Sequence, residues 1–286
     1  MGLVLDELVT LLSLERIEEN LFRGQSQDLG WGTVFGGQVL GQALSAATQT
    51  VGDGRLVHSL NAYFLRPGDV SRPIVYDVDR IRDGKSFATR RVVAIQNGEA
   101  ILNMAASFQV AEEGFEHHAP MPAAPKPEEC PLDRDRYKPY LEALPKLLAE
   151  RILAEHPFEI RLAGPTNDPF RPEKKPPERL AWIKATGALP ADPKLHPCLF
   201  AYASDHAFVT TALLPHGVSW LTPGMQVASL DHVMWFHRPF RADEWLLHVM
   251  DSPSASGARG LVRGRVYTER GELVASTAQE GLVRKR

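Results

Sequence analysis

Four consecutive residues, Ser229-Leu230-Asp231-His232, contain the three side-chain types of a serine hydrolase triad. They belong to a bulky apolar stretch, 228–240, that predicts a strand stopped by Pro239. Adjacent residues of a strand point to opposite faces of the sheet, so Asp231 and His232 cannot form a relay with each other. These four residues therefore do not by themselves predict a triad.

Other polar positions could take part in chemistry, but each has a simpler interpretation. Ser204-Asp205, near a helix start, would ordinarily cap that helix. Ser229 alone is most often a strand hydroxyl with satisfied hydrogen bonds, and Gln279 alone a solvent-facing amide. His58 could act as a base near neutral pH, although a histidine in a strand is more often structural. Taken singly, these residues define no site.

The sequence lacks other common catalytic and binding motifs. The sequence has no Gly-x-Ser-x-Gly elbow, which argues against an α/β-hydrolase. Gly84-Lys85-Ser86 resembles the end of a phosphate-binding loop, but Asp79 occupies the position of the required earlier glycine. No His-Glu-x-x-His or paired Cys-x-x-Cys motif occurs, so we expect no metal.

Composition narrows the class of protein. The chain has 286 residues, 44% hydrophobic residues and a net charge of −3, which gives no electrostatic case for nucleic acid or an anionic membrane. No apolar run approaches the roughly 20 residues of a membrane span, and the N-terminus is too acidic for a signal peptide. Two cysteines are too few for a disulfide framework, so we expect a cytoplasmic protein.

A repeated sequence segment indicates which structural elements position these residues. Residues 56–68 and 228–240 both carry an aromatic pair, one spacer and then Arg-Pro, as in Tyr63-Phe64-Leu65-Arg66-Pro67. The copies lie about 170 residues apart, a separation that suits two tandem copies of one small domain. We expect Arg66 and Arg238, at the ends of these strands, to pair with carboxylates.

Both copies predict a helix followed by an antiparallel meander. In the first, helices are expected over 3–12 and 37–51, with 14–24 tending toward a strand. The 37–51 helix is small or apolar on most faces, which indicates burial all round, as for a helix wrapped by a sheet. Strands then follow at 56–66, 73–82, 86–96 and 100–110, with turns at Asp83-Gly84 and Asn97-Gly98.

The second copy follows a proline-rich connector. Most of the 22 prolines lie between 111 and 200, where we expect one helix over 136–154 and a strand over 180–185. The second copy predicts a helix over 198–214 and then strands at 226–237, 244–252, 258–268 and 272–284. The predicted fold class is α+β, with domains over 1–110 and 176–286 and a connector over 111–175.

Five motifs, in order along the chain, resemble the acyl-CoA thioesterase II family. They are Val34-Phe35-Gly36-Gly37-Gln38, Tyr63–Gly68, Ser204-Asp205-His206, Ser229–Phe240 and Ala275–Gly281. The resemblance covers nearly the whole chain. It implies a double hotdog fold, in which each half is a long helix wrapped by an antiparallel sheet, and hydrolysis of acyl-CoA to CoA and a carboxylic acid without a cofactor.

The resemblance also implies a catalytic Asp, hydroxyl residue and Gln, which match Asp205, Ser229 and Gln279. Some family members carry Thr where this chain has Ser229. Because a thioester is already activated, the enzyme needs a base for water and donors for the developing oxyanion. We expect Asp205 to activate water and the backbone N–H groups of Gly36 and Gly37 to polarise the carbonyl. Direct attack by Asp205, giving an anhydride, is the alternative.

Two other functions compete with hydrolysis. A hotdog acyl-CoA hydratase or dehydratase would need a His and an acidic residue on the central helix, and 37–51 carries neither. A non-catalytic acyl-CoA-binding module would release no CoA. We further expect the acyl pocket between the two long helices, the two half-sheets joined into one, and a homo-oligomer, dimer or tetramer, formed through exposed strand edges.

Overall fold

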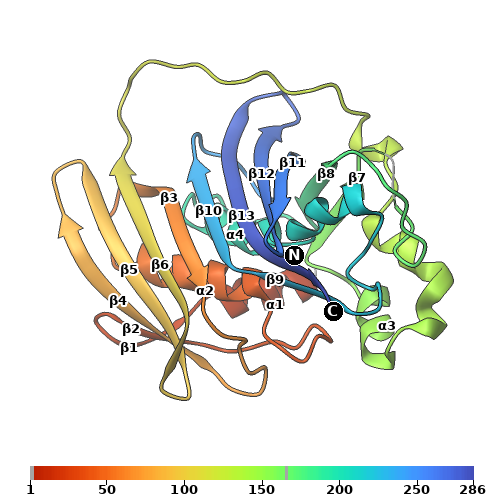
Figure 1. Cartoon of the computed structure of the whole chain (residues 1–286). Helices are drawn as coiled ribbons and strands as arrows, with labels where there is room; N and C mark the ends of the chain where they lie inside the picture. The colour runs from red at the N-terminus through yellow and green to blue at the C-terminus, as the bar shows by residue number, and fades with distance from the viewer. Residues whose placement is uncertain (1–2, 165–166) are drawn as a thin grey trace.

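A computed structural model describes residues 3–164 and 167–286 of the chain. Its strands form one 13-stranded antiparallel sheet, in the order β1-β2-β4-β5-β6-β3-β10-β13-β12-β11-β8-β7, with β9 paired to β13. The strands of the two halves lie side by side in this curved sheet, with β3 and β10 at its middle (Figure 1). The predicted continuous sheet and the α+β class are therefore confirmed.

The first half follows the sequence prediction closely. Its elements are α1 (Leu3–Leu12), β1 (Glu15–Glu18), β2 (Leu21–Gly24), α2 (Gly36–Gln49), β3 (Arg55–Phe64), β4 (Ile74–Asp83), β5 (Phe87–Gln96) and β6 (Glu99–Val110). The segment 14–24 is a hairpin of two short strands, β1 and β2, and not one strand. Asn97 (φ 52°) and Gly98 (φ 77°) make the predicted tight turn in the left-handed region.

Helix α2 is buried on nearly every side, as its composition predicts. Of its 14 residues, all but Gly36, Ser45 and Gln49 are buried. It packs on the inner face of the first half-sheet, where alternate residues of β6 are fully enclosed. These inner residues are Leu102, Met104, Ala106 and Phe108. A helix wrapped by a sheet is therefore confirmed.

The two repeated segments form the junction of the halves. Strands β3 and β10 (Asp231–Phe236) pair antiparallel, with Asp231 opposite Tyr63 and Trp235 opposite Ser59. The two arginines end them alike, because Arg66 donates to the carbonyl of Ala100 and Arg238 to that of Leu273. Each also meets a carboxylate at 3.4 Å, Glu99 for Arg66 and Glu116 for Arg238, as predicted.

The connector differs from the prediction in its helix. Instead of one helix over 136–154, the chain forms a 3-10 helix, η2 (Asp133–Ala143), and a short α3 (Lys146–Leu153). Pro145 interrupts them because a proline inside a helix removes a hydrogen bond and clashes with the preceding turn. The connector also supplies a strand to the sheet, since β7 (Phe158–Leu162) pairs with β8 (Glu178–Ala185).

In the second half, two predicted elements are broken. The helix expected over 198–214 is α4 (Leu195–Ser204) followed by a separate 3-10 helix, η3 (Val209–His216). The turn between them includes Ala207 at φ 56°. The strand expected over 226–237, within the longer stretch 228–240, is divided at Leu230 into β9 (Met225–Ser229) and β10.

The remaining strands match the prediction: β11 (Leu246–Ser256), β12 (Arg259–Thr268) and β13 (Leu273–Lys285). Among the described residues, no helix has both the length and the apolar character that a membrane crossing requires.

Candidate active site

The two long helices cross at glycines, which brings opposite ends of α2 and α4 together. A Cβ on Gly37 would overlap the carbonyl oxygen of Tyr202, and one on Gly41 would lie 3.0 Å from that of Cys198. The helices therefore run antiparallel, with the backbone of α4 at a distance that only glycine permits. The start of α2 lies beside the end of α4, where Asp205 follows.

Asp205 ends α4, and the structure brings Ser229 and Gln279 to its carboxylate. Its Oδ1 accepts hydrogen bonds from Gln279 Nε2 at 2.6 Å and from Ser229 Oγ at 3.2 Å. The Asp205 side chain is only 5% exposed. The simpler interpretation, in which Ser204-Asp205 caps a helix start, does not apply, because Asp205 is the C-cap of α4.

The second carboxylate oxygen of Asp205 faces the other half of the chain. A Cβ built on Gly36 would lie 2.7 Å from Asp205 Oδ2 and 3.1 Å from the Phe64 ring. Gly36 and Gly37 are the first residues of α2, so their N–H groups have no partner within the helix and carry its positive end. A carboxylate of one half thus meets the helix N-terminus of the other.

The surroundings of Asp205 favour its ionised form. Burial by itself would raise the pKa of this carboxyl, but the hydrogen bonds that Gln279 and Ser229 donate to Oδ1 favour the charged form, and the pKa lies below its usual value. Asp205 is therefore a carboxylate near neutral pH, although it is enclosed. Such a group can accept a proton from a water molecule at Oδ2.

His232 is a neighbour that the sequence did not identify. It is buried, its Nδ1 lies 3.1 Å from Gln279 Nε2 and 3.8 Å from Asp205 Oδ1, and its Nε2 lies 3.0 Å from Ser204 Oγ. Asp231 points to the opposite face and accepts the backbone N–H of Glu280, so the two form no relay, as predicted. The alternation with buried Met234 and Phe236 was the signal that His232 faces inward.

His58 is not brought to this cluster. Its Nε2 lies 2.8 Å from Ser107 Oγ and its ring packs edge-on against Phe87. It stands at the far end of β3 from Tyr63, which is the residue that pairs with Asp231. Its contacts are those of a structural histidine.

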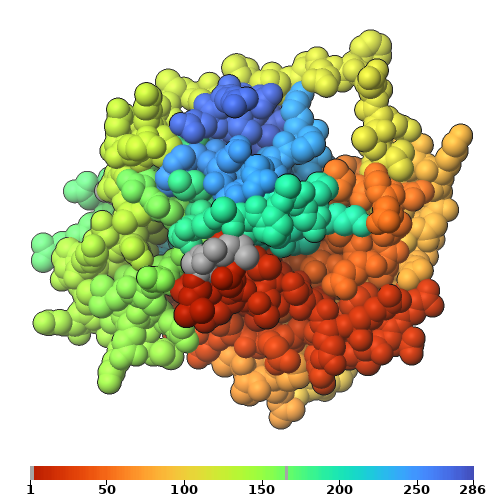
Figure 2. All heavy atoms as spheres, turned by 180° about the vertical axis from the view of Figure 1, so that it is seen from behind, coloured from red at the N-terminus to blue at the C-terminus, as the bar shows by residue number. Residues whose placement is uncertain are grey.

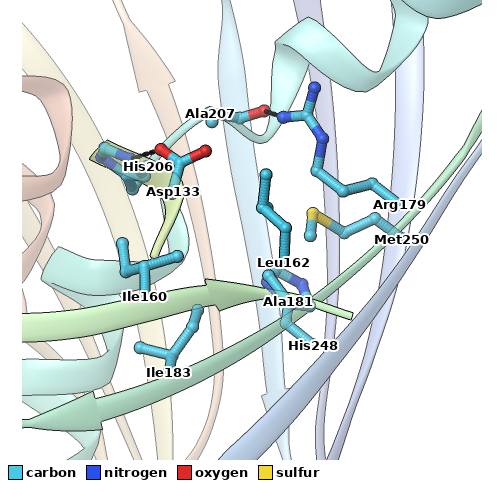
Figure 3. A pocket seen from close by; sticks show the side chains of 10 residues that line it. All are labelled: Asp133, Ile160, Leu162, Arg179, Ala181, Ile183, His206, Ala207, His248 and Met250. Carbon is cyan, nitrogen blue, oxygen red and sulfur yellow. Dashed lines mark hydrogen bonds and ion pairs between the residues drawn. The ribbon is translucent and has the colours of Figure 1, made fainter. Parts of the chain in front are cut away.

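A small cavity lies behind the turn that follows Asp205. Asp133 Oδ2 lies 3.4 Å from His206 Nε2, and Arg179 donates to the carbonyl of Ala207 at 2.8 Å. All four residues line the cavity (Figure 3). The cavity measures about 10 Å³, room for one water and not for an acyl chain. An acyl pocket between α2 and α4 therefore stays a prediction. Within residues 3–164 and 167–286, no cluster of three His, Cys, Asp or Glu side chains could hold a metal ion.

The fold and this site define a class: a double hotdog protein in which a carboxylate, a hydroxyl and an amide meet a helix N-terminus. Solved structures share the fold, including a hotdog protein of Alicyclobacillus acidocaldarius (TM-score 0.76, 20% identity, 98% of each chain). An acyl-CoA thioesterase II, TesB2, of Mycobacterium marinum matches with a TM-score of 0.78 and 41% identity over 98% of each chain.

Sequence comparisons give the particular family. The family described as "Acyl-CoA thioesterase" matches residues 148–282, and the "Acyl-CoA thioesterase N-terminal domain" matches 26–109. Acyl-CoA thioesterase 2 of Haemophilus influenzae is 46% identical over 98% of both chains. Acyl-coenzyme A thioesterase 8 of Homo sapiens is 43% identical over 97% of this chain and 88% of its own length. This chain belongs to the acyl-CoA thioesterase family and is a thioester hydrolase.

Proposed function

We propose that the chain hydrolyses acyl-CoA thioesters with water that Asp205 activates. One observation carries the proposal: Asp205 is held through Oδ1 by Gln279 and Ser229, while its Oδ2 faces the N-terminus of α2. A carboxylate fixed by one oxygen leaves the other to orient and deprotonate a water molecule. The helix N-terminus beside it supplies N–H groups where negative charge develops.

The reaction balances without a cofactor. Asp205 Oδ2 takes a proton from water as the water oxygen attacks the thioester carbonyl carbon. The carbonyl oxygen becomes an oxyanion and accepts hydrogen bonds from the N–H groups of Gly36 and Gly37. When the carbonyl re-forms, the C–S bond breaks, and the leaving thiolate takes the proton from Asp205. The products are a carboxylic acid and CoA.

An isotope experiment separates this route from attack by Asp205 itself. In a single turnover in heavy-oxygen water, the water route places the label in the released acid. The anhydride route places it in the Asp205 side chain, because water then cleaves the enzyme-bound anhydride. Label in the Asp205 peptide, detected by mass spectrometry, would contradict the proposal.

The competing functions predict different products. A non-catalytic binding module would release no free thiol from any acyl-CoA, and a hydratase would convert an enoyl-CoA without releasing CoA. Helix α2 carries neither of the acid–base residues that a hydratase needs. A thiol-trapping assay over short to long acyl chains measures hydrolysis and chain-length preference together.

We also propose that the enzyme is a cytoplasmic homo-oligomer, a dimer or tetramer. Support comes from large apolar side chains exposed at the middle of the sheet, Tyr63, Leu65 and Trp235. Grouped exposed apolar surface is characteristic of protein–protein contacts. Light scattering of the purified chain would test this, and a monomer mass at micromolar concentration would contradict it.

A further inference from the structure

A chain of buried hydrogen bonds leads from the backbone of α4 to Asp205. Ser204 Oγ lies 3.0 Å from the carbonyl oxygen of Ala201 and 3.0 Å from His232 Nε2. On the other side of the imidazole, Nδ1 lies 3.1 Å from Gln279 Nε2, which reaches Asp205 Oδ1 at 2.6 Å. Ser204, His232 and Gln279 are each 0% exposed, so no solvent molecule can replace a partner in this series of hydrogen bonds.

The direction of each hydrogen bond follows from the backbone end. The Ala201 carbonyl can only accept, so the Ser204 hydroxyl donates to it. The Ser204 oxygen then accepts the Nε2–H of His232, which leaves a lone pair on Nδ1. One N–H of the Gln279 amide donates to that lone pair and the other to Asp205. A proton on Nδ1 of His232 would instead face an N–H of the Gln279 amide, so that two donors would meet.

This arrangement leaves one atom without a partner. Gln279 Oε1 is buried and makes no hydrogen bond. An unpaired buried carbonyl is costly, so an amide free to rotate would turn this oxygen toward a donor. Rotation would place Oε1 against Asp205 Oδ1, oxygen against oxygen, unless that carboxyl took up a proton. An amide free to rotate would therefore stabilise the protonated carboxyl, unless a second acceptor keeps the amide nitrogen facing Asp205.

We propose that His232 is a positioning residue, whose Nδ1 lone pair fixes the Gln279 amide with its nitrogen toward Asp205. It does not touch the substrate in this account, and the proposal rests on Asp205 acting as the base. The second imidazole near His232 belongs to His248, which bonds Thr277 Oγ1 at 3.0 Å. Burial lowers the pKa of His248 to about 3, so it stays neutral. Asp231 faces away, and Asp205 is the one charged group that contacts His232 among the described residues.

Two substitutions of similar polarity test the role of Nδ1. His232→Asn places an acceptor near the position of Nδ1, whereas His232→Gln keeps only an atom near Nε2, which can donate to Ser204. We expect His232→Asn to keep kcat within about threefold of wild type. His232→Gln should lower kcat about tenfold or more and move the acid limb of the pH profile to higher pH, with KM unchanged in both. Equal kcat and equal acid limbs in the two variants would overturn the proposal.

A second variant tests the series of hydrogen bonds from Ser204 to Asp205 without changing the imidazole of His232. Ser204→Ala removes the acceptor that fixes the His232 tautomer, and Ser204 makes no hydrogen bond to Asp205. Its acid limb should also rise and its kcat fall. Thr277→Val is the matched control, because it removes an equally buried hydroxyl–histidine hydrogen bond that does not lead to Asp205. An acid limb at the wild-type pH in Ser204→Ala, or the same shift in Thr277→Val, would overturn the proposal.

Asp205→Asn, assayed in parallel, distinguishes a failure of the proposed base from a failure of the proposed role of His232. If Asp205→Asn retains turnover, the proposed base is wrong, and the role of His232 falls with it. If Asp205→Asn is inactive while His232→Asn and His232→Gln behave alike, only the role of His232 is refuted.

Discussion

At the scale of single residues, Asp205 combines burial with charge. Enclosure would normally favour the protonated acid, yet donors from two strands hold the carboxylate ionised through one oxygen. Ser229 lies at the end of β9 and Gln279 lies in β13, and β9 pairs with β13 beside them. The sheet therefore fixes both donors before any substrate binds, which is the preorganisation that electrostatic catalysis requires.

The lowered pKa of Asp205 predicts a broad acid range of activity. The proposed base can accept a proton only while it is ionised, so activity should fall only as the pH drops through the folded-state pKa of Asp205, below the ordinary value of 3.8. The same ionisation stabilises the fold above 3.8, and this contribution is lost as the pH falls through the lower folded value. Profiles of kcat/KM and of unfolding free energy against pH check both. An acid limb near pH 6 would contradict the assignment.

Ser229 is expected to act through its hydroxyl alone. Ser229→Ala removes one hydrogen bond to the Asp205 carboxylate, worth about 1.5–3 kcal/mol for a charged acceptor. We expect kcat about tenfold lower and an acid limb moved to higher pH. Ser229→Thr keeps the hydroxyl and should retain most of the activity. Similar losses in both variants would show that packing, not the hydroxyl, matters at this position.

At the scale of elements, the site depends on the close crossing of α2 and α4. Gly37 is expected to be the most sensitive point, because any Cβ there overlaps the Tyr202 carbonyl. Gly37→Ala should lower the free energy of unfolding by about 1–3 kcal/mol, the usual cost of overpacking. Urea denaturation measures it. Gly114→Ala is the control, since nothing lies within 4 Å of its Cβ position, and equal stability of the two variants would contradict this packing.

The sequence predicted these elements best where its periodicity was uninterrupted. The strands of the first half and the buried helix α2 have clean alternation or small apolar residues throughout, and the structure confirms them. The break after Ser204 was missed because apolar residues lie on both sides of Ser204-Asp205-His206 and no glycine or proline marks the turn, whose left-handed residue is Ala207. That break places Asp205 at a helix end, so the geometry of the site could not follow from helical spacing.

The sequence indicated three side chains that meet in the structure, but it did not indicate the hydrogen bonds between them and their neighbours. The family resemblance identified Asp205, Ser229 and Gln279, which converge although 74 residues separate the first from the last. His232 could be excluded from a relay with Asp231 by strand alternation, yet its contact with Gln279 needs the register of β10 and β13. The domain division at 110 and 176 stays a prediction.

At the scale of the whole molecule, two similar halves carry one carboxylate site. In β6, Ala106 lies four residues after Leu102, which pairs with Phe64. In β13, Gln279 lies four residues after Ala275, which pairs with Phe236, so Ala106 and Gln279 occupy equivalent positions. Opposite Ala106 the first half places Arg90, which is 1% exposed and donates to Thr50 Oγ1. The first half thus has an alanine where the second half has Gln279, with a buried guanidinium beside it. In the proposed mechanism, the base therefore comes from the second half and the first half contributes the N-terminus of α2.

The crossing segment, residues 111–126, is expected to be dispensable for joining the halves. It runs extended over one end of the molecule, and Figure 2 shows an opening beneath it. The halves are already paired through β3 and β10. Inserting about ten Gly/Ser residues after Gly114 should cost well under about 1 kcal/mol and leave kcat unchanged, because loop-closure entropy grows slowly with length. Loss of activity with a large drop in melting temperature would contradict this.

The most direct measurement of the central claim is kcat for Asp205→Asn. The substitution keeps the size of the side chain and removes the base. We predict a loss of about 10²–10⁴-fold in acyl-CoA hydrolysis, the usual contribution of a general base. The variant should stay folded, with a melting temperature lowered slightly because the stabilising ionisation of Asp205 is lost, and should keep its affinity for a non-hydrolysable thioether analogue. Turnover within a few-fold of wild type in the folded variant would contradict the account.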